Sequence, residues 1–253
     1  MSLFQEFKDI KDFFLSWFLS FLILTFVIFA IGFDKVNIFG NEFYVPIFSS
    51  NSLAVRMFEM IKNDLVPEGV NLIATSPVSA FVSQSIISLF TSLIVTFPFF
   101  LYKFIKYLSP ALYPKEKKAI LKVLAPSSLL FLGGAIFAYF IIIPPTFKVL
   151  YSFNTILGVA PFFVVSEFIS WTLALMFTTG LMFLLPIFMY FLSWLGLIPF
   201  TFWVDNWRIA LVAFLIISAI ITPDGSGVTM VLLTTPMAFL YIIGIKISKK
   251  NGV

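Results

Sequence analysis

The chain has 253 residues, of which 60% are apolar and only 11% are charged. Ordinary soluble domains are about 45–50% apolar and about 25% charged, so a soluble fold would leave apolar surface that these few charges cannot cover. Cysteine and histidine are both absent. Their absence excludes disulfides, thiolate or histidine metal sites and Ser–His hydrolysis. The composition therefore predicts an integral membrane protein, not a soluble enzyme, with no catalytic residues, no metal and no cofactor.

Six apolar segments follow one another along the chain. A hydrocarbon core about 30 Å thick needs about 20 apolar residues in a helix. The segments cover residues 13–33, 77–102, 123–144, 168–194, 209–222 and 228–245. The third is expected to end at Pro144-Pro145, because helix interiors disfavour proline. We expect one membrane domain over residues 1–253: an all-α bundle of six transmembrane helices, with short fifth and sixth helices.

The connections between these segments differ in length. Residues 34–69 are too many for a tight turn and contain apolar clusters at 43–48 and 53–60. A loop of this length predicts a cap with one or more short amphipathic helices on the periplasmic side. Gly196 and Pro199 break the fourth segment near its end, so residues 195–206 are predicted to be a loop. Residues 223–227 form a strong turn signal between the last two segments.

The lysines and arginines predict the orientation. With six spans, the N-terminus, the second and fourth connections and the C-terminus share one side of the membrane. That side holds Lys8, Lys11, Lys103, Lys106, Lys115, Lys117, Lys118, Lys122, Arg208, Lys246, Lys249 and Lys250. The other side holds Lys35, Arg56, Lys62 and Lys148. Cytoplasmic connections are enriched in Lys and Arg, so both termini are expected in the cytoplasm. Basic residues at segment ends do not form the single basic face of a nucleic-acid binder.

Few residues could carry chemistry inside the spans. Glu167 and Asp224 are predicted at outer ends of spans and Arg208 at an inner end. Transporters that relay protons keep ionisable residues inside the membrane, so a proton relay is disfavoured, whereas a secondary transporter of a neutral small solute stays open as an alternative. An intramembrane protease would need a Ser–His pair or two intramembrane aspartates, which this sequence does not offer.

Glu116 is the only acid in the basic connection between the second and third segments. One interpretation is ordinary solvated charge paired with nearby lysines. The other is a carboxylate site for a cationic partner. The surrounding residues leave both open.

Several short motifs occur in a fixed order on the six-segment pattern. The second connection contains a Pro-x-Leu-Tyr-x-x-Glu pattern formed by Pro110, Leu112, Tyr113 and Glu116. The further motif residues are Phe137-Ala138-Tyr139-Phe140 with Pro144, Gly180, Phe183 and Pro186, Arg208, Thr222-Pro223-Asp224, and Pro236. On these motifs the chain resembles the TatC family, the core subunit of the twin-arginine protein translocase, from about residue 2 to residue 246.

The resemblance implies a binding site for signal peptides. In the TatC family, the cytoplasmic N-terminal segment and the first cytoplasmic loop bind the Arg-Arg pair of a signal peptide. In the family's His-Leu-x-Glu-Leu-Arg pattern, Asp9 matches the glutamate and Lys11 the arginine, while Glu116 matches the loop's glutamate. Tyr107 stands where a phenylalanine is common. The resemblance thus implies Asp9, Lys11, Tyr107 and Glu116 as signal-peptide-binding residues.

The resemblance also implies partners and a location. It implies a receptor and scaffold without catalysis, which exports folded proteins across the cytoplasmic (inner) membrane. The implied partners are twin-arginine signal peptides, single-span subunits of the TatA and TatB type, and further copies of the chain in a homo-oligomer. One departure concerns the fourth span: where the family often has Glu or Gln between the Phe and the Pro, this chain has Leu184.

Overall fold

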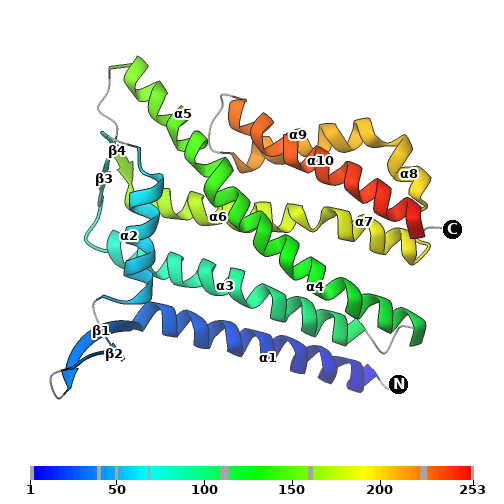
Figure 1. Ribbon diagram of the computed structural model, residues 1–253, viewed down its shortest axis with the longest axis horizontal. Helices are drawn as coiled ribbons and strands as arrows, with labels where there is room; N and C mark the ends of the chain where they lie inside the picture. The colour runs from blue at the N-terminus through cyan, green and yellow to red at the C-terminus, as the bar shows by residue number, and fades with distance from the viewer. Residues whose placement is uncertain are drawn as a thin grey trace. The chain divides into compact units, whose positions relative to one another are not determined.

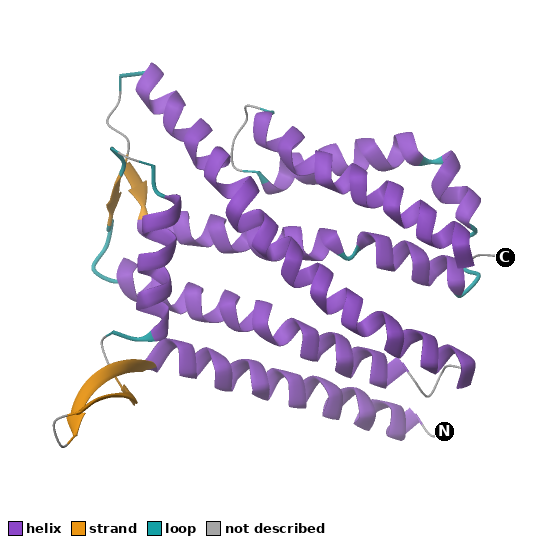
Figure 2. Cartoon of the chain, in the orientation of Figure 1, coloured by secondary structure: helices purple, strands orange, loops and turns teal. Residues whose placement is uncertain are grey.

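The computed structural model describes residues 3–38, 41–48, 51–67, 69–108, 114–158, 162–222 and 227–251, with side chains from Phe13 onward over most of these ranges. The chain forms two compact units: unit 1 contains Met1–Ala125 and Phe162–Leu173, and unit 2 contains Pro126–Pro161 and Ala174–Val253. Helices dominate both, and the described strands are confined to two short pairs (Figure 2). The chain is therefore the predicted helical, multi-pass membrane protein.

Unit 1 is built around two long helices. α1 (Leu3–Ala30) packs along α3 (Ser79–Leu108), and Figure 1 shows them side by side. Phe13 contacts Tyr107 near one end of the pair, and Phe29 contacts Phe81 near the other. These contacts make the helices antiparallel. Unit 1 also contains the start of α4 (Pro114–Phe137) and of α6 (Val165–Phe183).

The connection from α1 to α3 contains a β-hairpin, a short helix and a third strand. β1 (Ile31–Ile38) and β2 (Asn41–Phe48) form an antiparallel hairpin that pairs Ile31 with Phe48 and Ile38 with Asn41. α2 (Leu53–Leu65) follows, and then β3 (Asn71–Ile73), which pairs in parallel with β4 (Phe162–Val164). α2 buries Ala54, Ile61 and Leu65 and exposes Glu59, Lys62, Asn63 and Asp64. This amphipathic helix confirms that part of the predicted cap is helical, whereas the hairpin was not predicted.

Unit 2 holds the second half of the chain's helices. It contains the rest of α4, the π-helical turn η2 (Ala138–Ile142) and α5 (Ile143–Ile156). It also contains the rest of α6, followed by α7 (Leu185–Trp194), α8 (Phe200–Asp205), α9 (Trp207–Ile221) and α10 (Val228–Asn251). Its buried core consists of Ile142, Met182, Met189, Phe214, Leu233, Met237 and Tyr241.

Hydrogen bonds link the last helices of unit 2. The Tyr241 hydroxyl in α10 donates to the Trp203 carbonyl oxygen in α8 at 2.6 Å, and Trp203 Nε1 donates to Ser193 Oγ in α7 at 2.9 Å. The Thr234 hydroxyl donates to Ser218 Oγ between α10 and α9. Polar side chains inside a membrane protein need such internal partners, because lipid offers none.

The prediction that Pro144-Pro145 ends the third helix is wrong. Helical structure continues from Pro114 to Ile156, and the apolar stretch within it is Val123–Ile156, 34 residues long. The π turn η2 precedes the prolines, with the Ile143 N–H bonded to the Ala138 carbonyl five residues back. The prolines then lie in the first turn of α5, where a helix needs no N–H donor. The Thr146 hydroxyl also donates to the Ile142 carbonyl at 2.7 Å.

Two further predictions need correction. The sixth helix is not short: α10 has 24 residues and runs through Lys246 and Lys249, because lysines suit the C-terminal end of a helix, where carbonyl groups give a partial negative charge. Residues 195–206 are not all loop, since they contain α8.

The other helices compare more closely with the predicted segments. Among the described residues, five helical stretches are long and apolar enough to cross a membrane. α9, which corresponds to the predicted fifth span, is a shorter apolar helix of 15 residues, as predicted. The membrane boundaries themselves, and the assignment of residues 1–253 to one membrane domain, stay predictions.

Candidate functional site

One end of unit 1 gathers three helix ends from separate parts of the sequence. The start of α1 lies beside the end of α3, because these helices are antiparallel (Figure 1). α3 ends at Leu108 and α4 begins at Pro114. Six residue steps can span at most roughly 22 Å, so the first turn of α4 starts within that distance of the end of α3. The predicted residues Asp9, Lys11, Tyr107 and Glu116 all belong to these three helix ends.

Aromatic packing fixes α1 against α3 at this end. The Tyr107 ring stacks on Phe13, with centroids 5.9 Å apart and ring planes at 23°. Phe13 is buried and also meets Phe100 at 5.7 Å and Phe104 at 6.4 Å. Trp17, one turn further along α1, meets Phe100 at 5.1 Å. We call Phe13, Trp17, Phe100, Phe104 and Tyr107 the aromatic cluster.

The aromatic cluster positions the start of α1. Position 9 lies one helical turn before position 13, on the same side of α1, so the backbone of Asp9 lies just beyond the cluster. Lys11 lies between them in the sequence. The side chains of Asp9 and Lys11 lie outside the described part of the structure, which places the two residues on α1 by their backbone only.

Glu116 is the third residue of α4. The first turn of a helix has unpaired N–H groups and a partial positive charge, which favour a carboxylate there. The Glu116 side chain is outside the described part, as are residues Pro110, Leu112 and Tyr113 in their entirety. The structure thus brings three chain segments to one end of unit 1, while the distance between the Asp9 and Glu116 carboxylates stays a prediction.

The aromatic cluster is the feature that the sequence prediction missed, apart from Tyr107. Its signal was available: residues 13 and 17 are four apart, and 100, 104 and 107 are four and three apart, which is the spacing of one helix face. Nearby on α3, the Lys103 ammonium lies 5.2 Å from the centroid of the Phe99 ring. Such a cation–π contact is favourable, so the Lys103 ammonium already has a partner on α3.

The remaining predicted residues lie elsewhere. Pro144 lies in the first turn of α5, and the buried Pro186 lies in the first turn of α7. Arg208, in the first turn of α9, is exposed and lies 5.5 Å from the Trp207 ring. Pro223 and Asp224 lie outside the described residues. Pro144, Pro186 and Arg208 thus all lie in first turns of helices of unit 2.

Leu184 lies at a break between α6 and α7. Its N–H donates to the Leu181 carbonyl at 3.1 Å, and its own carbonyl accepts from Ile187 and Phe188 at 3.0 Å each. Pro186 has no N–H for the Met182 carbonyl, which explains why the helix breaks here. Leu184 is half-buried, so this apolar side chain occupies an irregular point of an otherwise continuous apolar stretch.

Among the described residues, no three His, Cys, Asp or Glu side chains lie close enough to hold a metal ion. The charged residues of the candidate site are instead divided between the helix ends described above.

Comparison with known proteins identifies the family. The family model described as Sec-independent protein translocase protein (TatC) matches residues 8–236. The Sec-independent protein translocase protein TatC of Aquifex aeolicus (strain VF5) is 35% identical over 232 residues, which cover 90% of each chain. The TatC of Cenarchaeum symbiosum (strain A) is 32% identical over 219 residues, covering 86% of this chain and 83% of that one.

A solved structure gives the same result. The crystal structure of the twin arginine translocase receptor TatC matches with a TM-score of 0.76 and 30% sequence identity, covering 97% of this chain and 99% of that chain. Both the sequence and the fold therefore match over nearly the full length. The chain belongs to the TatC family of Sec-independent protein translocase proteins.

Proposed function

We propose that this chain is the receptor for twin-arginine signal peptides and the core scaffold of a translocase that exports folded proteins. The observation that carries this proposal is the similarity, over 97% of the chain, to the solved twin arginine translocase receptor. The fold of unit 1 is consistent with it, because the segments that contain Asp9, Tyr107 and Glu116 all belong to helix ends of this unit.

The chemistry of the ligand fits these residues. Each arginine of an Arg-Arg pair has a planar guanidinium group that can donate two parallel hydrogen bonds to one carboxylate. We propose that Asp9 and Glu116 supply the carboxylates. Tyr107, held by Phe13, sets where α1 begins relative to α3. Lys11 keeps the positive charge that the family has at its position.

The location and the partners are part of the same proposal. The chain lies in the cytoplasmic membrane with both termini in the cytoplasm, as the distribution of Lys and Arg predicts. The helix ends of unit 1 then face the cytoplasm, where signal peptides arrive. Single-span subunits of the TatA and TatB type, and further copies of the chain, complete the complex.

The proposed role is binding and scaffolding without catalysis. It rests on family membership together with a sequence that lacks cysteine and histidine. The alternative, a secondary transporter of a neutral solute, is not favoured, since the relatives that match over most of their length are translocase proteins.

A binding titration tests the proposal. The purified chain in nanodiscs is titrated with a fluorescent twin-arginine signal peptide and, in parallel, with the same peptide carrying Lys-Lys. Both peptides have the same charge, so only the geometry of the cations differs. We expect clear saturable binding of the Arg-Arg peptide and much weaker binding of the Lys-Lys peptide. Equal affinities would contradict the proposed recognition.

A further inference from the structure

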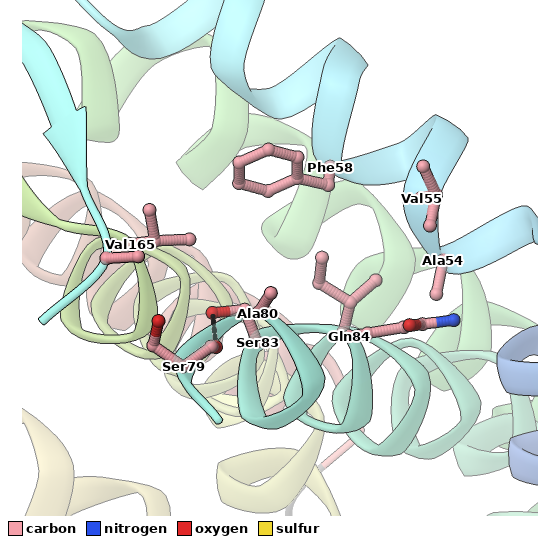
Figure 3. Close-up of a pocket in the computed structure, with 10 residues that line it drawn as sticks. Ala54, Val55, Phe58, Ser79, Ala80, Ser83, Gln84 and Val165 are labelled. Atoms are coloured by element: carbon pink, nitrogen blue, oxygen red, sulfur yellow. Dashed lines mark hydrogen bonds between the residues drawn. The ribbon is translucent and has the colours of Figure 1, made fainter. Parts of the chain in front are cut away.

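Unit 1 contains a cavity of about 280 Å³ between α2 and the first turns of α3. Figure 3 shows Val55 and Phe58 on α2 facing Ser79, Ala80, Ser83 and Gln84 on α3, with Val165 of α6 at one side. The lining residues are Ala54, Val55, Phe58, Ala74, Ser79, Ala80, Ser83, Gln84, Ile87 and Val165. The cavity lies at the opposite end of α3 from the candidate signal-peptide site.

The polar side chains of the wall have no hydrogen-bond donor left for a ligand. The Ser79 hydroxyl donates to the Ser76 carbonyl at 2.7 Å, and the Ser83 hydroxyl donates to the Ser79 carbonyl at 2.8 Å (Figure 3). Gln84 Nε2 has two hydrogens and donates to the Phe29 carbonyl at 2.9 Å and to Ser52 Oγ at 2.8 Å. A polar ligand would lose its bonds to water here without full replacement, which is costly. Because the exposed surface of the wall is also almost entirely apolar, it favours an apolar occupant.

The depth of the cavity matches the chains of one lipid leaflet. The apolar stretch of α3 begins at Ser79. Ile87 is the lining residue furthest along α3, eight residues later, or roughly 12 Å along the helix axis. Half of a hydrocarbon core is about 15 Å thick. Val78, which directly precedes α3, and Phe81 and Val82 in its first turn are exposed. If this turn of α3 lies in the hydrocarbon core, as its apolar stretch predicts, lipid chains cover these side chains next to the cavity.

We propose that an acyl chain of a membrane phospholipid occupies this cavity and holds α2 against α3. The volume is just below the range of about 300–1,000 Å³ typical of ligand pockets, so it suits part of one chain and not a whole lipid. With the orientation proposed above, this lipid belongs to the periplasmic leaflet. The inference concerns the opposite end of unit 1 from the signal-peptide site and does not depend on peptide binding.

Photo-cross-linking in nanodiscs tests this assignment. The probe is phosphatidylethanolamine with a diazirine in one acyl chain, and labelled residues are mapped by mass spectrometry. We expect labelling of Val55 and Phe58, which face the cavity from α2. The variant Ala80→Phe should fill the cavity and abolish this labelling. The matched control Val82→Phe adds the same ring two residues later, outside the cavity wall, and should leave the labelling unchanged.

Other outcomes overturn the proposal. Equal labelling of Val55 and Phe58 in the two variants would show that the lipid contacts α2 from outside the cavity. No labelling in the unmodified protein would show that no acyl chain enters. A signal peptide with a photoreactive group in its apolar core, labelling the same residues where the lipid does not, would reassign the cavity to peptide. If Ala80→Phe fails to fold, Ala74→Phe fills the cavity from another wall and decides the question.

Discussion

The ring of Tyr107 stacks on the ring of Phe13 and so ties the last turn of α3 to α1, one turn after Asp9. Phe13 is the centre of this arrangement, because it also meets Phe100 and Phe104. The candidate recognition site therefore begins where the aromatic cluster ends. Any change in the cluster should alter the position of Asp9 without removing a charge.

Substitutions of Tyr107 separate ring packing from hydroxyl chemistry. Tyr107→Phe keeps the ring and should bind an Arg-Arg signal peptide nearly as well as the unmodified chain. Tyr107→Ala removes the stacking, and aromatic pairs are worth about 0.5–1.5 kcal/mol beyond their buried area. At about 1.4 kcal/mol per tenfold change, affinity should fall by roughly two- to tenfold. A peptide titration measures both variants. Equal losses for Phe and Ala would indicate instead that the hydroxyl contacts the peptide.

Two adjacent glycines of α4 allow a stability test with an internal control. A Cβ added at Gly134 would lie 2.7 Å from Phe183 Cγ and 3.0 Å from Gly180 Cα, whereas a Cβ at Gly133 meets nothing within 4 Å. Overpacking typically costs about 1–3 kcal/mol. Gly134→Ala should therefore lower the thermal unfolding temperature in detergent, and Gly133→Ala should not.

The helices of unit 2 explain that expectation. α4 and α6 approach closely at Gly134 and Gly180, since a Cβ at Gly180 would lie 2.9 Å from the Phe131 carbonyl oxygen. Small residues permit such close approach between membrane helices. Similar unfolding temperatures for the two glycine variants would mean that α4 and α6 can separate at little cost.

The sequence predicts the helices well and their irregularities poorly. Apolar length alone locates the long helices, because lipid permits few other structures. It does not predict that helix continues past Pro144, since the π turn that accommodates the prolines depends on local hydrogen bonds. The sequence prediction also ends the sixth helix just before Lys246, although a helix can extend past the membrane into water. It also does not predict the β1–β2 hairpin, since the apolar cluster at 43–48 is assigned to the cap.

The candidate site is predicted unevenly for a related reason. Family motifs indicate Tyr107. Its partner Phe13 lies 94 residues earlier in the sequence, and only the packing of α1 against α3 brings the two rings together. The bonds of Gln84 to Phe29 and Ser52 join three segments in the same way. Such contacts depend on how α1 is aligned along α3, and apolar periodicity leaves that alignment undetermined.

The absence of cysteine makes the orientation directly testable. Single cysteines at Asn63, which is exposed on α2, and at Lys117, near the start of α4, report opposite sides of the membrane under the six-span prediction. A membrane-impermeant maleimide added to intact cells should label Asn63→Cys and not Lys117→Cys. Labelling after cell lysis controls for accessibility. Reversed labelling would place the termini outside the cytoplasm.

Leu184 tests the most prominent departure from the family pattern. Leu184→Glu puts an ionisable group at the break between α6 and α7, where burial in lipid costs several kcal/mol unless a partner satisfies it. We expect the variant to insert and to cross-link more strongly to a single-span subunit, whose polar groups can bond the carboxyl group. Leu184→Met is the matched apolar control. Unchanged cross-linking would show that position 184 is a packing surface only.

The two proposed carboxylates give the sharpest test of recognition. Hydrogen bonds to charged groups contribute about 1.5–3 kcal/mol, and about 1.4 kcal/mol corresponds to tenfold in affinity. Glu116→Gln and Asp9→Asn should each weaken binding of an Arg-Arg signal peptide by roughly 10- to 100-fold, since each keeps the shape of the side chain and removes its charge. Asp12→Asn removes an acid three residues along α1 and should have a smaller effect.

The basic residues around Glu116 make this test demanding. Lys115, Lys117 and Lys118 repel the same cation, so Glu116 can bind it only if the first turn of α4 holds its carboxylate closer to the peptide than their ammonium groups. Long-range attraction would weaken steeply with salt, whereas a direct hydrogen-bonded pair is screened much less. Titrations at low and at physiological ionic strength should therefore show the loss in Glu116→Gln at both. A loss that disappears at physiological ionic strength would reduce Glu116 to part of the general surface charge.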